Sequence, residues 1–238
     1  MKTVGIVLAA GSGKRMGTEV KKQYLLLHER PVLYYSLKAM QDSFIDEIVL
    51  VTSKDDLEYV KANIVDEFGF SKVSAVVEGG KERYHSVLCG LRAIDDADFV
   101  FIQDGARPLL DNDILKRCLD AVSVHEACVV GMPSKDTVKI ANDKGFVATT
   151  PNRNLVWNIQ TPQVFKFSLI KEAYESIVSR ETELKDRGVN ITDDAMVLEE
   201  YNGHPVFLVE GSYENIKVTT PEDMLLAELF LKKGVDIN

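Results

Sequence analysis

The chain has 238 residues, of which 45% are hydrophobic and 27% charged, and its formal net charge at pH 7 is −9. No apolar run approaches the roughly 20 residues of a membrane span, so a membrane protein is not expected. The acidic charge argues against general nucleic-acid binding, which needs an extended basic surface, but not against a small anionic ligand held by a few cations.

Length and cysteine usage define the expected organisation. We predict one domain over residues 1–238, because a chain of this size buries a sufficient core without disulfides. No targeting segment is expected, since the first apolar run is too short for a signal peptide. Cys89, Cys118 and Cys128 are odd in number and lack metal-ligand spacing, so we expect reduced thiols in a cytoplasmic protein.

A glycine-rich loop follows the first predicted strand. The apolar run 4–8 predicts a buried parallel strand, and residues 8–16 read LAAGSGKRM. Gly11 and Gly13 let backbone N–H groups approach an anion, and Lys14, Arg15 and Lys22 add three cations. The two glycines alone would favour a plain strand-to-helix turn. The cationic cluster is what favours polyphosphate binding.

Two common phosphate-binding motifs do not fit this loop. It lacks the spacing of a P-loop, and Met16 stands where a dinucleotide fingerprint has its third glycine. The usual ATPase, GTPase and dehydrogenase interpretations are therefore disfavoured.

Strand-like and helix-like runs alternate through the first half of the chain. The predicted elements are a helix at 31–40, a strand at 47–52, a surface helix at 54–68, and strands at 73–77 and 99–103. This alternation predicts an α/β fold of Rossmann-like type, with a mostly parallel twisted sheet flanked by helices.

A second glycine turn follows the third predicted strand. Residues 78–83 read EGGKER and open a helix that contains Ser86. Ligands of open α/β sheets bind beyond the carboxyl ends of the strands, so Gly80, Arg83 and Ser86 are candidates for contact with the same nucleotide. A helix start with exposed charges is an equally good interpretation of this segment in isolation.

Asp104 ends the fourth predicted strand, in the sequence DGARP. A carboxylate beside Gly105 at this position is a natural ligand for Mg²⁺, which takes one or two carboxylates together with phosphate oxygens. The alternative is a capping aspartate paired with Arg107, which fits the arginine better than the aspartate.

The second half of the chain departs from simple alternation. We expect a helix at 111–124, a strand at 127–132, a hairpin of 137–140 and 146–149, helices at 168–186 and 194–201, a strand at 206–209, and a final helix capped by Thr220 and Pro221. The segment Gln160–Gln163 reads as a turn. A lone hairpin is marginal by itself, so an arm at about 133–157 should project and be buried against a second subunit.

The motifs carry a resemblance as an ordered set. AAGSGKRM, KQY, EGGKERYHS, DGARP, KDTVK, QTPQ, ITDDA and VEGSYENIKVTTPED occur in this order between Val4 and about Leu229. The chain thereby resembles the nucleotidyltransferases that join CTP to a polyol phosphate, specifically the 2-C-methyl-D-erythritol 4-phosphate cytidylyltransferases. The resemblance implies a nucleotidyltransferase fold, Mg²⁺ as cofactor, and a homodimer formed through the hairpin arm.

The resemblance also implies roles for particular residues. The nucleotide would be held by Ala10, Gly11, Gly13, Gly80, Arg83, Ser86, Asp104 and Gly105. Arg15, Lys22 and Lys217 would be catalytic and line the phosphates, with Asp104 beside Mg²⁺. Methylerythritol phosphate would meet Asp104, Arg107, Thr192 and Lys217 of one chain together with Thr137 and Arg153 of the other. Two departures are Lys21, where the family often has proline, and Gly105, where some members have alanine.

The chemistry implied requires no general base. A phosphate monoester has its second pKa near 6, so at neutral pH the acceptor is mostly a dianion and already a nucleophile. This agrees with a sequence in which His28, His85, His125 and His204 lie outside any acid–base motif. The alternatives are a ribitol 5-phosphate cytidylyltransferase and a catalytically silent nucleotide-binding module.

Overall fold

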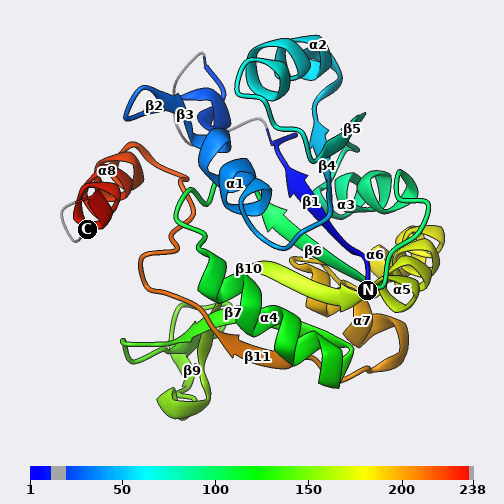
Figure 1. Ribbon diagram of the computed structural model, residues 1–238. Coiled ribbons are helices and arrows are strands. Elements are labelled where there is room, and N and C mark those ends of the chain that lie inside the picture. Colours follow the sequence, from blue (N-terminus) through cyan, green and yellow to red (C-terminus); the bar gives the residue numbers. More distant parts are fainter. Residues whose placement is uncertain (12–19, 236–238) are drawn as a thin grey trace.

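The computed structural model describes residues 1–11 and 20–235, and within them seven strands form one mixed sheet (Figure 1). The strand order is β11–β7–β10–β6–β1–β4–β5, and only the pairs made by β10 are antiparallel. The strands are β1 (Thr3–Leu8), β4 (Glu47–Thr52), β5 (Val73–Glu78), β6 (Phe99–Asp104), β7 (Ala127–Pro133), β10 (Trp157–Lys166) and β11 (Phe207–Glu210). The predicted mostly parallel α/β sheet is confirmed.

Helices cover both faces of this sheet. One face packs against α3 (Arg83–Arg92), α5 (Phe167–Ser179) and α7 (Asp194–Asn202), and the other against α1 (Val32–Gln41), α2 (Leu57–Val60) and α4 (Asn112–His125). Side chains of a strand point alternately to its two faces, so Val4 and Ile6 of β1 join the first core and Val7 the second. The near-continuous apolar strands are thus explained by burial on both faces.

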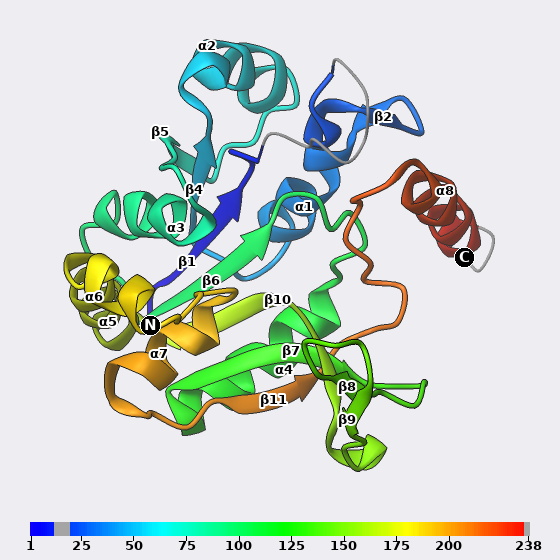
Figure 2. The same ribbon diagram turned by 180° about the vertical axis from the view of Figure 1, so that it is seen from behind.

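The order of the strands fixes where a ligand can bind. The chain moves from β1 outward to β4 and β5, and then α3 returns it to β6 on the opposite side of β1. Figure 2 shows β1 and β6 side by side in the middle of the sheet. In open α/β sheets ligands bind where the strand order reverses, beyond the carboxyl ends of the strands. Here that place is the end of β1 and β6, where Leu8 is in register with Asp104.

The segment predicted as a turn at Gln160–Gln163 lies instead within β10, and that prediction was wrong. The strand pairs antiparallel with β6 and β7, with a shift of register between Ile159 and Gln163 and a cis peptide bond before Pro162. Proline removes a ladder hydrogen bond and argues against a central strand in a sequence. The irregular register accommodates it.

Several helix boundaries also differ from the prediction. The helix expected at 54–68 is divided into a 3₁₀ turn, η3 (Lys54–Asp56), followed by α2 and a π-helical segment, η4 (Lys61–Asp66). The helix expected at 168–186 is broken at Arg180 into α5 and α6 (Glu181–Asp186). The last strand, β11, begins one residue later than predicted, and the final helix is α8 (Pro221–Val235).

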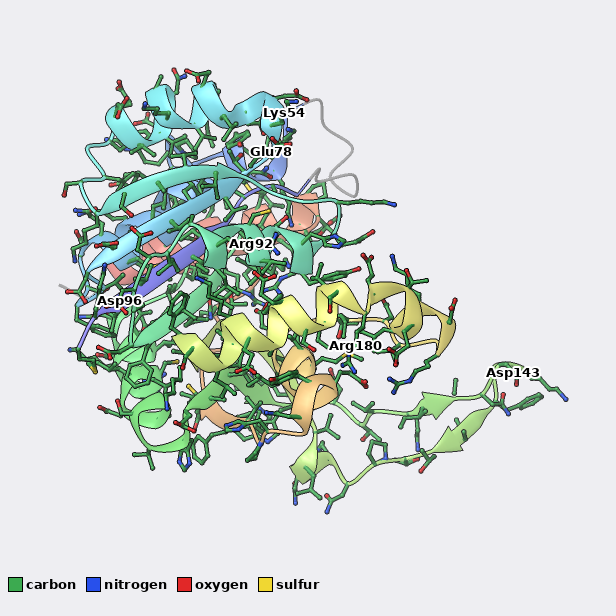
Figure 3. The ribbon with its side chains drawn as sticks, turned by 90° about the vertical axis from the view of Figure 1, so that its right-hand side faces the viewer. Lys54, Glu78, Arg92, Asp96, Asp143 and Arg180 are labelled. Atoms are coloured by element: carbon green, nitrogen blue, oxygen red, sulfur yellow. The ribbon has the colours of Figure 1, made fainter. Side chains whose placement is uncertain are left out.

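The predicted hairpin is present and projects from the body. Its strands are short, β8 (Ile140–Ala141) and β9 (Val147–Thr149), and they pair only with each other among the described strands. Asn142 and Gly145 form the tip, with Gly145 at φ 81°, where glycine is favoured. Figure 3 shows the arm extending away from the sheet, with Asp143 near its end.

Outside the sheet, a small hairpin of β2 (Leu26–Leu27) and β3 (Arg30–Pro31) supports α8. Leu27 and Val32 pack there with Val218 and Ala227 in a separate small core. Among residues 1–11 and 20–235, no helix combines the length and the apolar character needed to cross a membrane.

Candidate active site

A pocket of about 370 Å³ lies at the carboxyl ends of β1 and β6. The described part of its lining comes from five separate segments of the chain: Leu8, Ala9, Ala10, Gly11, Lys22, Gln23, Gly80, Lys81, Glu82, Arg83, Ser86, Asp104, Ala106 and Lys217. Among these described residues, four side chains are cationic and two are anionic. Such a hollow suits a polyanionic ligand, because a cleft with an excess of positive charge concentrates anions.

The turn that follows the first loop supplies one wall of the pocket. A 3₁₀ turn, η2 (Lys22–Tyr24), holds Lys22 so that its Nζ donates to the carbonyl of Val218 at 2.8 Å. The buried Gln23 side chain donates to the carbonyls of Ala9 and Gly11 at 2.6 and 3.1 Å. The glutamine therefore fixes the end of β1, while Lys22 links this wall to the segment that carries Lys217.

The second glycine turn supplies another part of the lining. The hydroxyl of Ser86 accepts from the backbone N–H of Gly80 at 3.1 Å. A Cβ on Gly79 would lie 2.8 Å from the Cβ of Ala10, and one on Gly80 would lie 2.3 Å from the Cβ of His85. Both glycines are thus required by the close approach of this turn to the loop after β1 and to the start of α3.

Asp104 lies at the centre of a cluster of cations. Its carboxylate is 2.8 Å from Nζ of Lys217, 3.4 Å from Nε of Arg83 and 3.7 Å from Nε of Arg107. Burial opposes ionisation, but the charges of Arg83, Lys217 and Arg107 outweigh it and hold the pKa of Asp104 well below its ordinary value. The carboxylate is therefore charged at neutral pH and gathers three cations at the end of one strand.

Asp194 is a site-supporting residue that sequence reasoning missed. Its fully buried carboxylate accepts from the two terminal nitrogens of Arg83 at 2.7 and 2.8 Å, and also from the hydroxyl of Tyr174. A bidentate arginine–carboxylate pair fixes orientation as well as position. It stands in the motif ITDDA, at the start of the helix expected at 194–201, but the motif alone does not indicate its contact with Arg83. The neighbouring Asp193 caps α7, and accepts from the N–H of Met196 at 3.0 Å.

Buried polar groups hold the segment that carries Lys217 in place. Asn215 is fully buried, and its side chain donates to the carbonyl of Thr161 at 2.9 Å. The backbone carbonyl of Asn215 accepts from Nη1 of Arg107 at 2.8 Å, and the N–H of Val218 donates to the carbonyl of Ala106 at 2.8 Å. Arg107 thus braces this segment and is not one of the residues that line the pocket.

The remaining predicted site residues lie elsewhere. Gly13, Lys14 and Arg15 are outside the described residues. Gly105 is buried beneath the pocket, where an added Cβ would be 2.9 Å from the carbonyl oxygen of Leu8. The other three, Thr137, Arg153 and Thr192, do not line the pocket of their own chain; the first two belong to the arm segment, and all are exposed or half-buried.

The residues of the pocket offer few metal ligands. Over residues 1–11 and 20–235 there is no group of three or more His, Cys, Asp or Glu side chains that would hold a metal ion. Asp104 provides a carboxylate already surrounded by three cations. A divalent cation fits here only when the charge of a bound polyphosphate accompanies it, which is the usual way in which Mg²⁺ binds in such sites.

Replacing Asp104 by Asn should lower the free energy of unfolding by about 3 kcal/mol at pH 7, because it leaves buried cations unpaired. Since folding lowers the pKa of Asp104, its stabilising effect is present above about pH 4 and is lost as the pH falls toward the folded-state value. The difference between wild type and variant should therefore shrink below about pH 4. Urea unfolding over this pH range measures it, with Asp42→Asn, in an exposed pair with Lys38, as control. A difference that does not vary with pH would contradict this prediction.

Known proteins resemble this chain over nearly its whole length. Residues 3–233 match the sequence model of the 2-C-methyl-D-erythritol 4-phosphate cytidylyltransferase family. A protein of that name from Lachnoclostridium phytofermentans is 49% identical over 235 residues, which cover 99% of this chain and 98% of the relative. The crystal structure of 4-diphosphocytidyl-2C-methyl-D-erythritol synthase from Anaerococcus prevotii matches with a TM-score of 0.84 at 34% identity, covering 97% of this chain and 96% of that one. A cytidylyltransferase structure from Francisella tularensis has a TM-score of 0.76 at 27% identity, with 96% and 99% covered. The chain belongs to the 2-C-methyl-D-erythritol 4-phosphate cytidylyltransferase family.

Proposed function

We propose that this chain carries out the reaction of its family in the pocket beyond β1 and β6. CMP is transferred from CTP to 2-C-methyl-D-erythritol 4-phosphate, which gives 4-diphosphocytidyl-2-C-methyl-D-erythritol and pyrophosphate. The main observation behind this placement is that Nζ of Lys217 lies 2.8 Å from the carboxylate of Asp104. Both residues line the pocket, together with Lys22 and Arg83.

The chemical step joins two anions. An oxygen of the acceptor phosphate attacks the α-phosphorus, and the bond from this phosphorus to the oxygen bridging to the β-phosphate breaks. The electron pair leaves with pyrophosphate. No proton must be removed first, because the acceptor is mostly a dianion at neutral pH. The protein must therefore supply alignment and positive charge, the terms that dominate phosphoryl chemistry.

We assign the positive charge to three residues. Lys22 and Arg15 would neutralise the triphosphate and the departing pyrophosphate, although Arg15 is outside the described residues. Lys217 would act at the α-phosphate. The pair it makes with Asp104 supports this role, because a cation already held by a fixed carboxylate needs little reorganisation when charge develops on the ligand.

The nucleotide would lie between the two glycine turns. Ala10 and Gly11 line one side of the pocket, and Gly80, Arg83 and Ser86 line the other. A Cβ at Gly80 would lie 2.3 Å from the Cβ of His85, so glycine lets this turn pass close to the start of α3.

Mg²⁺ is proposed as the cofactor, with Asp104 as its protein ligand. When bound, it acts as a Lewis acid that withdraws charge from phosphate oxygens. Its principal ligands would be the phosphates of CTP, because Asp104 already binds cationic side chains.

The acceptor is tested by comparing turnover with two polyol phosphates. With CTP and Mg²⁺ saturating, methylerythritol phosphate should support release of pyrophosphate, and ribitol 5-phosphate should support much less, because acceptor choice depends on a few pocket contacts. Faster turnover with ribitol 5-phosphate would reverse the assignment. Absence of pyrophosphate with either acceptor would indicate a silent nucleotide-binding module.

Lys22→Ala and Lys217→Ala should each raise the activation free energy by about 3 kcal/mol, because each removes a cation used in the transition state. Turnover should therefore fall about 100-fold. Steady-state kcat at saturating CTP and acceptor measures the effect. Lys116→Ala serves as the control, since its Nζ makes only an exposed contact of 4.0 Å with Asp113. Turnover near that of wild type in both variants would remove the catalytic assignment.

We further propose that the enzyme is a cytoplasmic homodimer joined through the arm. Free Cys89, Cys118 and Cys128 suit a reducing compartment. Large apolar side chains lie open on the arm, with Phe146 70% and Leu155 79% exposed, which supports burial against another subunit. Thr137 and Arg153 would then reach the acceptor bound to the partner, together with Arg107 and Thr192 of the chain that binds it.

Mixing inactive variants tests the crossed arm. Lys217→Ala damages the pocket and Arg153→Ala damages the arm, so a mixed dimer contains one intact site. Random exchange of subunits should restore about a quarter of wild-type activity. Lys217→Ala mixed with Lys22→Ala should restore none, because both lesions lie in the pocket. Native mass spectrometry would verify the mixed dimers, and inactivity of verified Lys217→Ala/Arg153→Ala dimers would refute action in trans.

A further inference from the structure

The turn that carries Lys22 is held by residues on both of its sides. The turn η2 has only three residues, and its N-cap, Lys21, makes no side-chain capping hydrogen bond. A single 3₁₀ turn has poor hydrogen-bond geometry and does not define its own position. The position of Lys22 in the pocket must therefore come from contacts with the rest of the protein.

Asp56 makes two of these contacts with one oxygen. Its Oδ2 accepts from Nζ of Lys21 at 2.7 Å and from the hydroxyl of Tyr24 at 2.9 Å. These two residues flank Lys22 and Gln23 in the sequence. One carboxylate thus binds both sides of the segment that lines the pocket, although Asp56 itself is not one of the lining residues.

The end of β4 completes this anchor. Nζ of Lys21 also donates to Oγ of Ser53 at 2.7 Å, and the hydroxyl of Tyr24 lies 3.0 Å from Oγ1 of Thr52, the last residue of β4. Thr52 is itself fully buried, so these contacts attach the turn to the rigid sheet. The turn η2 is thereby fixed to β4, an interior strand of the sheet.

The ion pair is shielded from solvent. The side chains of Lys21 and Asp56 are 29% and 16% exposed, in contrast to 48% and 55% for the Lys38–Asp42 pair on α1. Burial opposes ionisation of Asp56, but hydrogen bonds from Lys21, Ser53 and Tyr24 outweigh it and lower the pKa. Burial, together with the neighbouring Asp56, raises the pKa of Tyr24, so its hydroxyl keeps the proton that it donates.

We propose that Asp56 is a positioning residue for cytidylyl transfer, which acts by clamping Lys21 and Tyr24 and so holding Lys22 at the phosphates of the substrate. This rests on the role proposed above for Lys22. Because one arm of the clamp is an ion pair, turnover in this chain depends on ionic strength through Lys21 as well as through the substrate.

The backbone of Lys21 offers a way to separate the ion pair from the conformation of the turn. Its φ is −62° and its ψ is 139°, close to the values that proline adopts. Lys21→Pro therefore removes the charge but restrains the chain in the observed conformation, whereas Lys21→Met removes the charge and leaves the chain free.

A double-mutant cycle tests the proposal. We expect Asp56→Ala to lower kcat about 10-fold, since a small misplacement of a catalytic group has effects of this order. In a Lys22→Ala background the same change should alter kcat less than about twofold, because its effect passes through Lys22. Asp42→Ala is the matched control and should leave kcat unchanged. Thermal unfolding of each variant establishes that it is folded. If Asp56→Ala does not fold, Asp56→Asn takes its place in the cycle.

A second comparison tests the ion pair itself. Lys21→Met should lower kcat severalfold, and Lys21→Pro should recover most of it. Between about 50 and 500 mM KCl, kcat at saturating substrates should fall more steeply for wild type than for Lys21→Pro, because salt screens the pair.

The outcomes separate this proposal from the assignment of Lys22. If Lys22→Ala impairs turnover but the effect of Asp56→Ala is fully additive, Asp56 does not act through Lys22 and only the present proposal is overturned. If Lys22→Ala turns over normally, both fall. Equal kcat and equal salt dependence in wild type and Lys21→Met would show that the Lys21–Asp56 ion pair does not contribute to turnover.

Discussion

Asp104 organises the site because a buried carboxylate is costly unless cations and hydrogen bonds compensate it. Here the compensation comes from Arg83 at the start of α3, Arg107 just after β6, and Lys217 beyond β11. One charge at the end of β6 therefore draws together segments distant in sequence. Its three partners carry more positive charge than it cancels. Two of these partners, Arg83 and Lys217, line the pocket.

Other carboxylates hold the cations of the pocket, either directly or through a neighbouring residue. The buried Asp194 binds Arg83 directly, and Asp56 binds Lys21, the residue before Lys22. Side chains with many rotamers are thereby ordered when the protein folds. Binding then does not bear that entropic cost, which is the advantage of preorganisation. The same carboxylates also connect the site to the two helical layers and to β4.

This arrangement suits a reaction that needs alignment and charge but no proton transfer by the protein. Three of the four histidines have other contacts: His85 forms part of the cap of α3 and meets Glu181, His125 stacks on Phe207, and His28 contacts the carbonyl of Glu228. Among the described residues that line the pocket there is no histidine.

The sequence by itself determined the α/β fold, the sheet edge at which the site lies, and most of the residues that line it. These depend on local signals: apolar runs of strand length, glycines where backbones approach closely, and charged residues directly after strands. Ala10, Gly11, Lys22, Gly80, Arg83, Ser86, Asp104 and Lys217 were all identified in this way or by resemblance, and all line one pocket. The ordered motifs also identified the family.

Only the tertiary structure decided which residues support that pocket. The strand β10 was missed because its proline and polar residues resemble a turn, and its place between β6 and β7 depends on pairing with strands remote in sequence. Asp194 and Asn215 stand in the motifs ITDDA and VEGSYENIKVTTPED, but these motifs do not indicate which partners the two side chains bind, and Asp56 stands outside them. An aspartate that caps a helix and one that binds an arginine 111 residues away look alike in sequence. Arg107, which was expected to meet substrate, also braces the segment of Lys217, a contact that the sequence did not indicate. The physical reason is that burial and long-range pairing give these polar groups their role, and neither is encoded in the neighbouring residues.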